Sequence, residues 1–340
     1  MGKERIAYID FMKGLCILLI VMEHMPNANF YDSLLPHLDN TLKSFRIPMY
    51  FFLSGLFFKT YNGFNDFLRK KTNNLIITLL FFHFLCCFFK FPLVAIVHKV
   101  RPDVIIDFRI IDIIPPFLGR FWRAAGALWF LVALFLVNIL YYIFHTFWGK
   151  RGVVIAVFIS SILGYSLMKF KIVLPFEGDI ALVGLPYFLL GSFIKQNNFL
   201  APSKYDKLGY FVFLPICIFL YHYSSNISFL YQVVPNFFLL YFIPFIAILS
   251  LFWLCKNLRY IPLICYFGRY SVIILGTHQL LISYVFFLIR GIYPLVGITQ
   301  SIIIFTIVMF IEFFIIKFMI KYFPRFTAQE EFFKPGWKVK

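Results

Sequence analysis

The segment YIDFMKGLCILLIVMEHMP, residues 8–26, is apolar enough to form a membrane-spanning helix, yet it contains Asp10, Lys13, Glu23 and His24. Lys13 and His24 are eleven residues apart, so on an α-helix both lie on one face, about 16 Å apart along the axis. Ionisable groups at membrane depth are costly and usually face a protein-lined path. The segment therefore predicts a first span with a functional polar face. The alternative is a plain span whose charged ends contact the membrane interface.

The composition is typical of a membrane protein with many spans. The 340 residues are 61% hydrophobic and 22% aromatic, and the mean hydropathy is +0.85. Few soluble domains have this composition. The net charge of +17 is spread between the apolar segments instead of forming one stripe, so lipid headgroups explain it and nucleic-acid binding is excluded. The six cysteines lie in or beside apolar segments without metal-ligand spacing, so we expect inert thiols and no metal site.

About ten apolar segments are long enough to cross a bilayer. They predict an all-α fold, a polytopic membrane helix bundle that forms a single integral-membrane domain over residues 1–340. Most of the basic residues fall on one side if the N-terminus is cytoplasmic, so both termini are expected in the cytoplasm. The expected spans lie near residues 8–26, 45–61, 73–98, 126–146, 152–168, 180–195, 208–223, 236–255, 268–289 and 298–322.

The second predicted span supplies three candidate site residues. We expect it to open at Arg46, with Pro48 in its first turn, where the missing N–H costs little. Arg46 would then lie at the level of His24, where a guanidinium binds a carboxylate, a phosphate or the headgroups. Ser54 and Gly55 allow close approach of another helix or of a ligand.

Later segments supply further candidates. Trp129 lies near the start of the fourth span, close to the outer interface, where an aromatic residue is common. His278 lies inside the ninth span, where a histidine is either a site residue or a hydrogen-bond partner of a neighbouring helix. The mixed-charge segment 99–125, with a Pro-Pro pair, predicts an outer loop that either contacts a polar substrate or is only a solvated lid.

Four motifs resemble the acyltransferase type 3 family, which consists of bacterial multipass membrane O-acyltransferases of cell-surface glycans. Lys13-x10-His24 is similar to its basic-x10-His signature; lysine replaces the more frequent arginine, as in the subgroup that starts D-x-x-K-G. MYFFLSGLFF resembles its Phe-Phe-x-x-Ser-Gly element and contains Ser54 and Gly55, and ALWFL, with Trp129, resembles the Trp-Phe of its fourth span. GRYSVIILGTHQ is similar to its late Ser…His segment, with Ser271 and His278. The chain resembles the short, membrane-only members.

The resemblance implies transfer of an acyl group, usually acetyl, from acyl-CoA to a sugar hydroxyl. His24 would be the general base and Lys13 would meet a phosphate of the coenzyme. Asp10 is placed to pair with Lys13, and Glu23 is a possible support for His24. Arg46, Ser54, Gly55, Trp129 and His278 are the remaining candidates for substrate contact.

The implied partners are the acyl-CoA donor, a free or lipid-linked glycan acceptor and membrane lipids. Acetyl-CoA would be a donor substrate, with no permanently bound cofactor. The implied location is the bacterial cytoplasmic membrane. Transient acylation of His24 itself is an open alternative mechanism. A secondary transporter or flippase for a lipid-linked sugar is the alternative function, because intramembrane charge suits it too.

Overall fold

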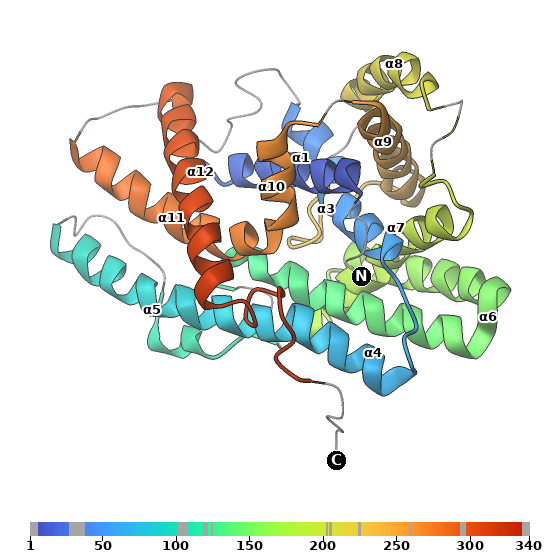
Figure 1. The fold of residues 1–340 in the computed structure, drawn as a ribbon, viewed down its shortest axis with the longest axis horizontal. Coiled ribbons are helices and arrows are strands. Elements are labelled where there is room, and N and C mark those ends of the chain that lie inside the picture. The colour runs from blue at the N-terminus through green and yellow to red at the C-terminus, as the bar shows by residue number, and fades with distance from the viewer. Residues whose placement is uncertain are drawn as a thin grey trace.

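The computed structural model describes residues 6–26, 38–100, 108–117, 122–123, 125–201, 203, 206–223, 226–258, 260–292 and 297–334, which are helices joined by turns and one isolated β-bridge. The helices, labelled in Figure 1, are α1 (Ala7–Glu23), α3 (Leu38–Leu56), α4 (Phe64–Lys71), the π-helix η1 (Thr72–Ile76), α5 (Ile77–Val100), α6 (Trp129–Lys169), α7 (Gly178–Gln196), α8 (Leu208–Tyr223), α9 (Phe237–Asn257), α10 (Pro262–Arg269), α11 (Ser271–Ile292) and α12 (Gly297–Tyr322). Short 3-10 turns are η2 (Ile110–Ile113), η3 (Gly126–Leu128) and η4 (Pro175–Glu177).

Local sequence signals explain several helix ends. Helix α9 begins after Asn236, whose side-chain oxygen accepts a hydrogen bond from the N–H of Leu239 at 2.9 Å. Helix α10 begins with Pro262 in its first turn. Gly149, at φ +62°, interrupts α6, and this break lies between the spans predicted at 126–146 and 152–168.

Glycines allow two helix pairs to approach at backbone distance. A Cβ on Gly55 of α3 would lie 2.0 Å from the carbonyl oxygen of Phe188 in α7, and one on Gly191 of α7 would lie 2.0 Å from that of Phe52. Gly268 of α10 fits against α1 in the same way. Small residues at helix contacts are typical of membrane bundles, where packing holds the helices together. These contacts fix α1 and α3, the two helices that carry most of the candidate residues (Figure 1).

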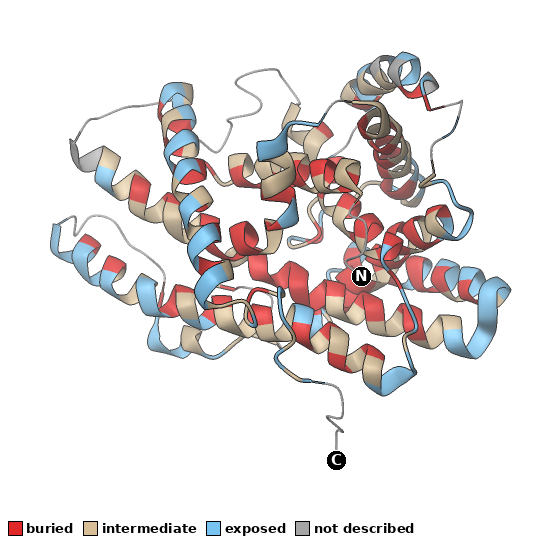
Figure 2. Ribbon diagram, in the orientation of Figure 1, coloured by how far each residue is buried: buried red, intermediate tan, exposed pale blue. Residues whose placement is uncertain are grey.

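The structure confirms an all-α, multi-pass membrane architecture. In the described part of the chain, six helical segments are long and apolar enough to cross a membrane: 64–100, 126–169, 175–196, 237–257, 271–289 and 297–322. Buried residues concentrate where the helices meet, and exposed ones lie on outer surfaces (Figure 2). Many exposed side chains are large and apolar, such as Phe88 of α5, Ile155 of α6 and Phe310 of α12, which suits contact with lipid. The count of about ten spans and the cytoplasmic termini stay predictions.

The expected start of the second span is wrong. Helix α3 begins at Leu38, so Pro48 lies inside the helix and not in its first turn. The first two turns of α3 are polar, so hydropathy alone did not predict that they are helical. They are nevertheless helical, with Lys43 and Asp39 forming an i,i+4 ion pair at 2.5 Å.

Candidate functional site

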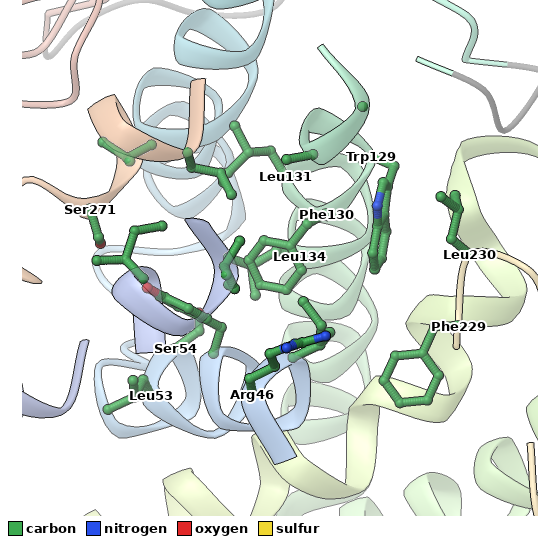
Figure 3. A pocket seen from close by; sticks show the side chains of 18 of the residues that line it. Arg46, Leu53, Ser54, Trp129, Phe130, Leu131, Leu134, Phe229, Leu230 and Ser271 are labelled. Atoms are coloured by element: carbon green, nitrogen blue, oxygen red, sulfur yellow. The ribbon is translucent and has the colours of Figure 1, made fainter. Parts of the chain in front are cut away.

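A cavity of about 640 Å³ lies between α1, α3, η1, α6, α11 and the turn at residues 227–231. Most of its wall is apolar, including Ile17 and Ile20 of α1 and Phe130 and Leu134 of α6. Figure 3 shows Arg46, Trp129, Phe130 and Leu134 around the space, with Phe229 and Leu230 of the turn on one side and Ser54 and Ser271 on the other. Polar side chains gather at its two ends.

One end of the cavity is basic. Lys13 of α1 lies here, with its ammonium 4.7 Å from the centre of the Phe57 ring. Lys71 and Asn74 also line the cavity, and Lys71 is only 9% exposed. Phe57 and Phe58 close α3 at this end, and the ammonium of Lys195 donates a hydrogen bond to the Phe58 carbonyl at 2.8 Å. This end therefore presents ammonium groups to whatever enters the cavity.

The other end carries Glu23, His24, Lys43 and Arg46. Arg46 of α3 is 1% exposed and forms an ion pair with Glu23 of α1, and the carboxylate of Asp39 lies 3.7 Å from the same guanidinium. A buried guanidinium needs such partners because removing its charge from water is costly. The pair joins the end of α1 to α3 directly beside His24.

The contacts of His24 define which nitrogen is free to act as a base. Nδ1 of His24 lies 2.8 Å from the carbonyl oxygen of Ile20. A carbonyl oxygen only accepts, so Nδ1 carries the proton and Nε2 carries the lone pair. The fully buried His278 of α11 packs edge-on against His24, with 5.0 Å between ring centres, and its own Nδ1 lies 2.7 Å from the carbonyl of Ile274. His278 thus supports the His24 ring from behind.

A second cavity of about 330 Å³ adjoins the His24 end. It shares His24, Gly126 and Gln279 with the first cavity. Its lining is mainly polar, unlike that of the larger cavity. The complete lining is His24, Lys90, Trp122, Arg123, Gly126, Gln279, Leu280, Ile282 and Ser283. His24 consequently stands at the junction of an apolar cavity and a polar one.

Most of the predicted candidates lie on the main cavity, and three do not. The structure brings Lys13, Glu23, His24, Arg46, Ser54, Trp129 and Ser271 to its wall. Gly55 instead contacts α7, and the carbonyl of Asp10 packs against Gly268 of α10. The place of His278 is behind His24, outside the lining of both cavities. The expected substrate contacts of Gly55, Asp10 and His278 therefore have no counterpart in the cavity walls. The roles of the other residues stay predictions.

Sequence reasoning missed Lys71 and Asn74. Lys71 directly precedes the π-helix η1 and Asn74 lies inside it, and a π-helix is a rare element that often marks a functional site. The π-helix is fastened by the C-terminal segment, because the Asn73 side chain donates to the Phe333 carbonyl at 2.9 Å and accepts from the Phe333 N–H at 2.8 Å. Glu331 forms ion pairs with Arg69 and Lys70 of the preceding helix. No local sequence signal announces a contact across 260 residues.

The segment 99–125 lies only partly within the described residues. Its charged residues Arg101, Asp103, Asp107 and Arg120 are outside them. Within the described part, the Arg109 backbone N–H donates to the Asp112 carboxylate at 2.7 Å, and that carboxylate also lies 3.8 Å from the guanidinium of Arg123. Lys99 belongs to α5, not to the loop. Arg123 and Trp122 bring this segment to the second cavity.

The chain was compared with protein families, curated proteins and solved structures. Residues 6–318 match the model of a family described as an acyltransferase domain. The comparisons with curated proteins and with solved structures returned no match. Within the described residues, no group of three or more His, Cys, Asp or Glu side chains is arranged to hold a metal ion.

Proposed function

Because this chain belongs to the acyltransferase type 3 family, we propose that it transfers an acyl group, most simply acetyl, from acyl-CoA to a hydroxyl of a cell-surface or lipid-linked sugar. The match covers nearly the whole chain and supports acyl transfer by a multi-pass membrane protein. The observation that carries the finer proposal is the one cavity with Lys13 and Lys71 at one end and His24 at the other. The transporter or flippase alternative finds no support in the comparisons.

The shape of the cavity suits an acyl-CoA donor. Ammonium groups bind phosphate as point charges, so Lys13 and Lys71 would hold the phosphates of the coenzyme. Eleven residues of α1 separate Lys13 from His24, about 16 Å along the helix axis. The phosphopantetheine arm has a length of this order, and the apolar wall between the two ends suits its chain. The thioester would then reach His24 while the nucleotide stays at the basic end.

The proposed reaction is direct transfer with His24 as general base. Nε2 of His24 takes the proton of the acceptor hydroxyl as its oxygen attacks the thioester carbonyl. Collapse of the tetrahedral intermediate breaks the C–S bond, and the protonated imidazole returns the proton to the departing thiolate. The products are the O-acyl sugar and free coenzyme A. The Ile20 carbonyl holds Nδ1, which fixes the tautomer that this step requires.

Arg46 and Glu23 have a positioning role in this proposal. Their ion pair holds α3 against the end of α1, one residue before His24. Because the base must stay within hydrogen-bond reach of the hydroxyl proton, small shifts of this end would slow the transfer. We further propose that the protein lies in the bacterial cytoplasmic membrane, with the basic end toward the cytoplasmic pool of acyl-CoA.

The experiment uses the full chain in nanodiscs with acetyl-CoA labelled in its acetyl group and a lipid-linked glycan extract. Wild type should move label to glycan, and His24→Ala should lower this rate at least about 100-fold, the lower range for a general base. His222→Ala, at an exposed histidine of α8, is the matched control and should keep the wild-type rate. Transfer by His24→Ala at the wild-type rate would reject the base. Label trapped on His24 would instead select the acyl-histidine route.

A further inference from the structure

The second cavity has the chemistry of a site for a negatively charged hydroxyl compound. We propose that it binds the acceptor and selects one that carries a carboxylate or phosphate beside the reacting hydroxyl. This rests on the proposed function, since it assigns the larger cavity to the donor. The two cavities meet at His24, so a hydroxyl held in the smaller one faces the base from the side opposite the donor arm.

The charges around this cavity favour an anion. Lys90 of α5 and Arg123 line it, and no acidic residue of the described chain does. The carboxylate of Asp112 lies 3.8 Å from the Arg123 guanidinium and also interacts electrostatically with Lys90, so it offsets one of the two positive charges. The ammonium of Lys90 donates one hydrogen bond, to the Arg123 carbonyl at 2.5 Å. An ammonium has three N–H groups, so Lys90 keeps donors for a ligand.

An unpartnered donor points to the same chemistry. Trp122 is 3% exposed, and its indole N–H has no hydrogen-bond partner among the described residues. A buried N–H without a partner is costly, so a site that leaves one open favours a ligand that accepts a hydrogen bond from it. Tryptophan nitrogen only donates, as do the ammonium and guanidinium groups. The lining of the second cavity therefore favours a ligand with several oxygen atoms that accept hydrogen bonds.

The volume limits what enters. A cavity of 330 Å³ is at the lower end of the roughly 300–1,000 Å³ that small-molecule sites occupy. It accommodates one sugar ring with its charged substituent, not the nucleotide of a coenzyme. The Gln279 amide lies at the border with the larger cavity, 3.0 Å from where a Cβ of Gly126 would stand, and adds a neutral contact for ring hydroxyls.

The test measures binding without any donor, so it does not depend on turnover. Radiolabelled methyl glucoside, methyl glucuronide and glucose 1-phosphate are dialysed against the full chain in nanodiscs. We expect the glucuronide, the phosphate or both to bind at least about tenfold tighter than the neutral glucoside, the effect of one charge-assisted hydrogen bond. The two anionic probes decide between a uronic acid and a sugar phosphate.

Variants separate this site from general adsorption. Lys90→Gln and Trp122→Phe should each remove most of the anion preference and leave the weak binding of the glucoside unchanged. Lys99→Gln, at an exposed lysine on the same helix, should keep the preference. Equal binding of all three probes, binding of none, or an anion preference that survives both variants would overturn the proposal. Acetyl-CoA consumption, measured separately, reports on the proposed function.

Discussion

Gly55→Ala tests how α3 is held beside the cavity. The added Cβ would lie 2.0 Å from the Phe188 carbonyl oxygen, whereas real Cβ contacts essentially never fall below 3.0 Å. Helices α3 and α7 must therefore separate by about 1 Å. The opposing Gly191 meets the Phe52 carbonyl in the same way, so neither helix can yield without losing the matching contact. The displaced obstacle is backbone, not a flexible side chain.

The expected sign is opposite to the ordinary effect of this substitution. Replacing glycine by alanine inside a helix ordinarily raises the stability by about 1 kcal/mol. Overpacking of a tight contact costs about 1–3 kcal/mol, so the net result should be a lower Tm. Ser54, the preceding residue, lines the cavity and moves with the helix. A displacement of 1 Å in a site costs up to about 100-fold in rate, so acetyl transfer should also fall.

Thermal unfolding in nanodiscs and the acetyl-transfer rate are the two measurements. Gly184→Ala is the matched control, because it also lies on α7 facing α3, but the atoms nearest to its added Cβ belong to the ring of Phe51, at 3.0 Å, and not to backbone. That ring can shift by a few tenths of an ångström, so the control should lose much less in both measurements. A Gly55→Ala protein with unchanged or higher Tm and a normal rate would refute the packing argument.

Two further predictions concern the two ends of the cavity, and a third concerns the C-terminal segment. Glu23→Gln should cost about 1–3 kcal/mol and lower Tm, since it removes a carboxylate from the buried Arg46; a double-mutant cycle with Arg46→Met should show coupling, and additive effects would contradict the pair. Lys71→Ala should raise KM for acetyl-CoA about tenfold but not for acetyl-pantetheine, while Lys59→Ala changes neither; equal effects on both donors would exclude a phosphate contact. Partial burial raises the pKa of Glu331, but hydrogen bonds from two basic side chains of α4 hold that pKa below its ordinary value. Its stabilising contact is therefore complete above the ordinary pKa of about 4.3 and is lost as pH falls through the lowered pKa. Proteolysis of the C-terminal segment should show this acid step in wild type and not in Glu331→Gln.

The sequence predicted that Lys13 and His24 share one face of α1, because that relation depends on helix geometry alone. The spacing of Lys13 and His24 requires them to share a side, and both line the cavity. Arg46 is predicted to lie at the same depth as His24 because the first two spans are expected to be antiparallel neighbours. Its ion pair with Glu23, the residue before His24, agrees with that placement. Local periodicity sufficed for these positions.

Other features depend on contacts that no local pattern encodes. The π-helix beside Lys71 is fastened by Phe333, and the turn at residues 227–231 closes the cavity from a segment far from α1. The motif around Gly55 allows close approach of either a ligand or a helix. Only the position of Phe188 shows that helix α7 occupies the space beside Gly55. The second cavity is lined by residues of α5, α11 and the segment after η2, which are far apart in the sequence. It forms only when the chain folds, so no local pattern predicts it.

A cryo-electron microscopy structure of the protein with a non-hydrolysable thioether analogue of acetyl-CoA tests directly whether the main cavity holds the acyl donor with its thioester at His24. We expect the phosphates within hydrogen-bond distance of Lys13 and Lys71, and the acyl carbonyl beside the imidazole of His24. A nucleotide bound at the Arg46 end, or an analogue held outside the main cavity, would contradict it.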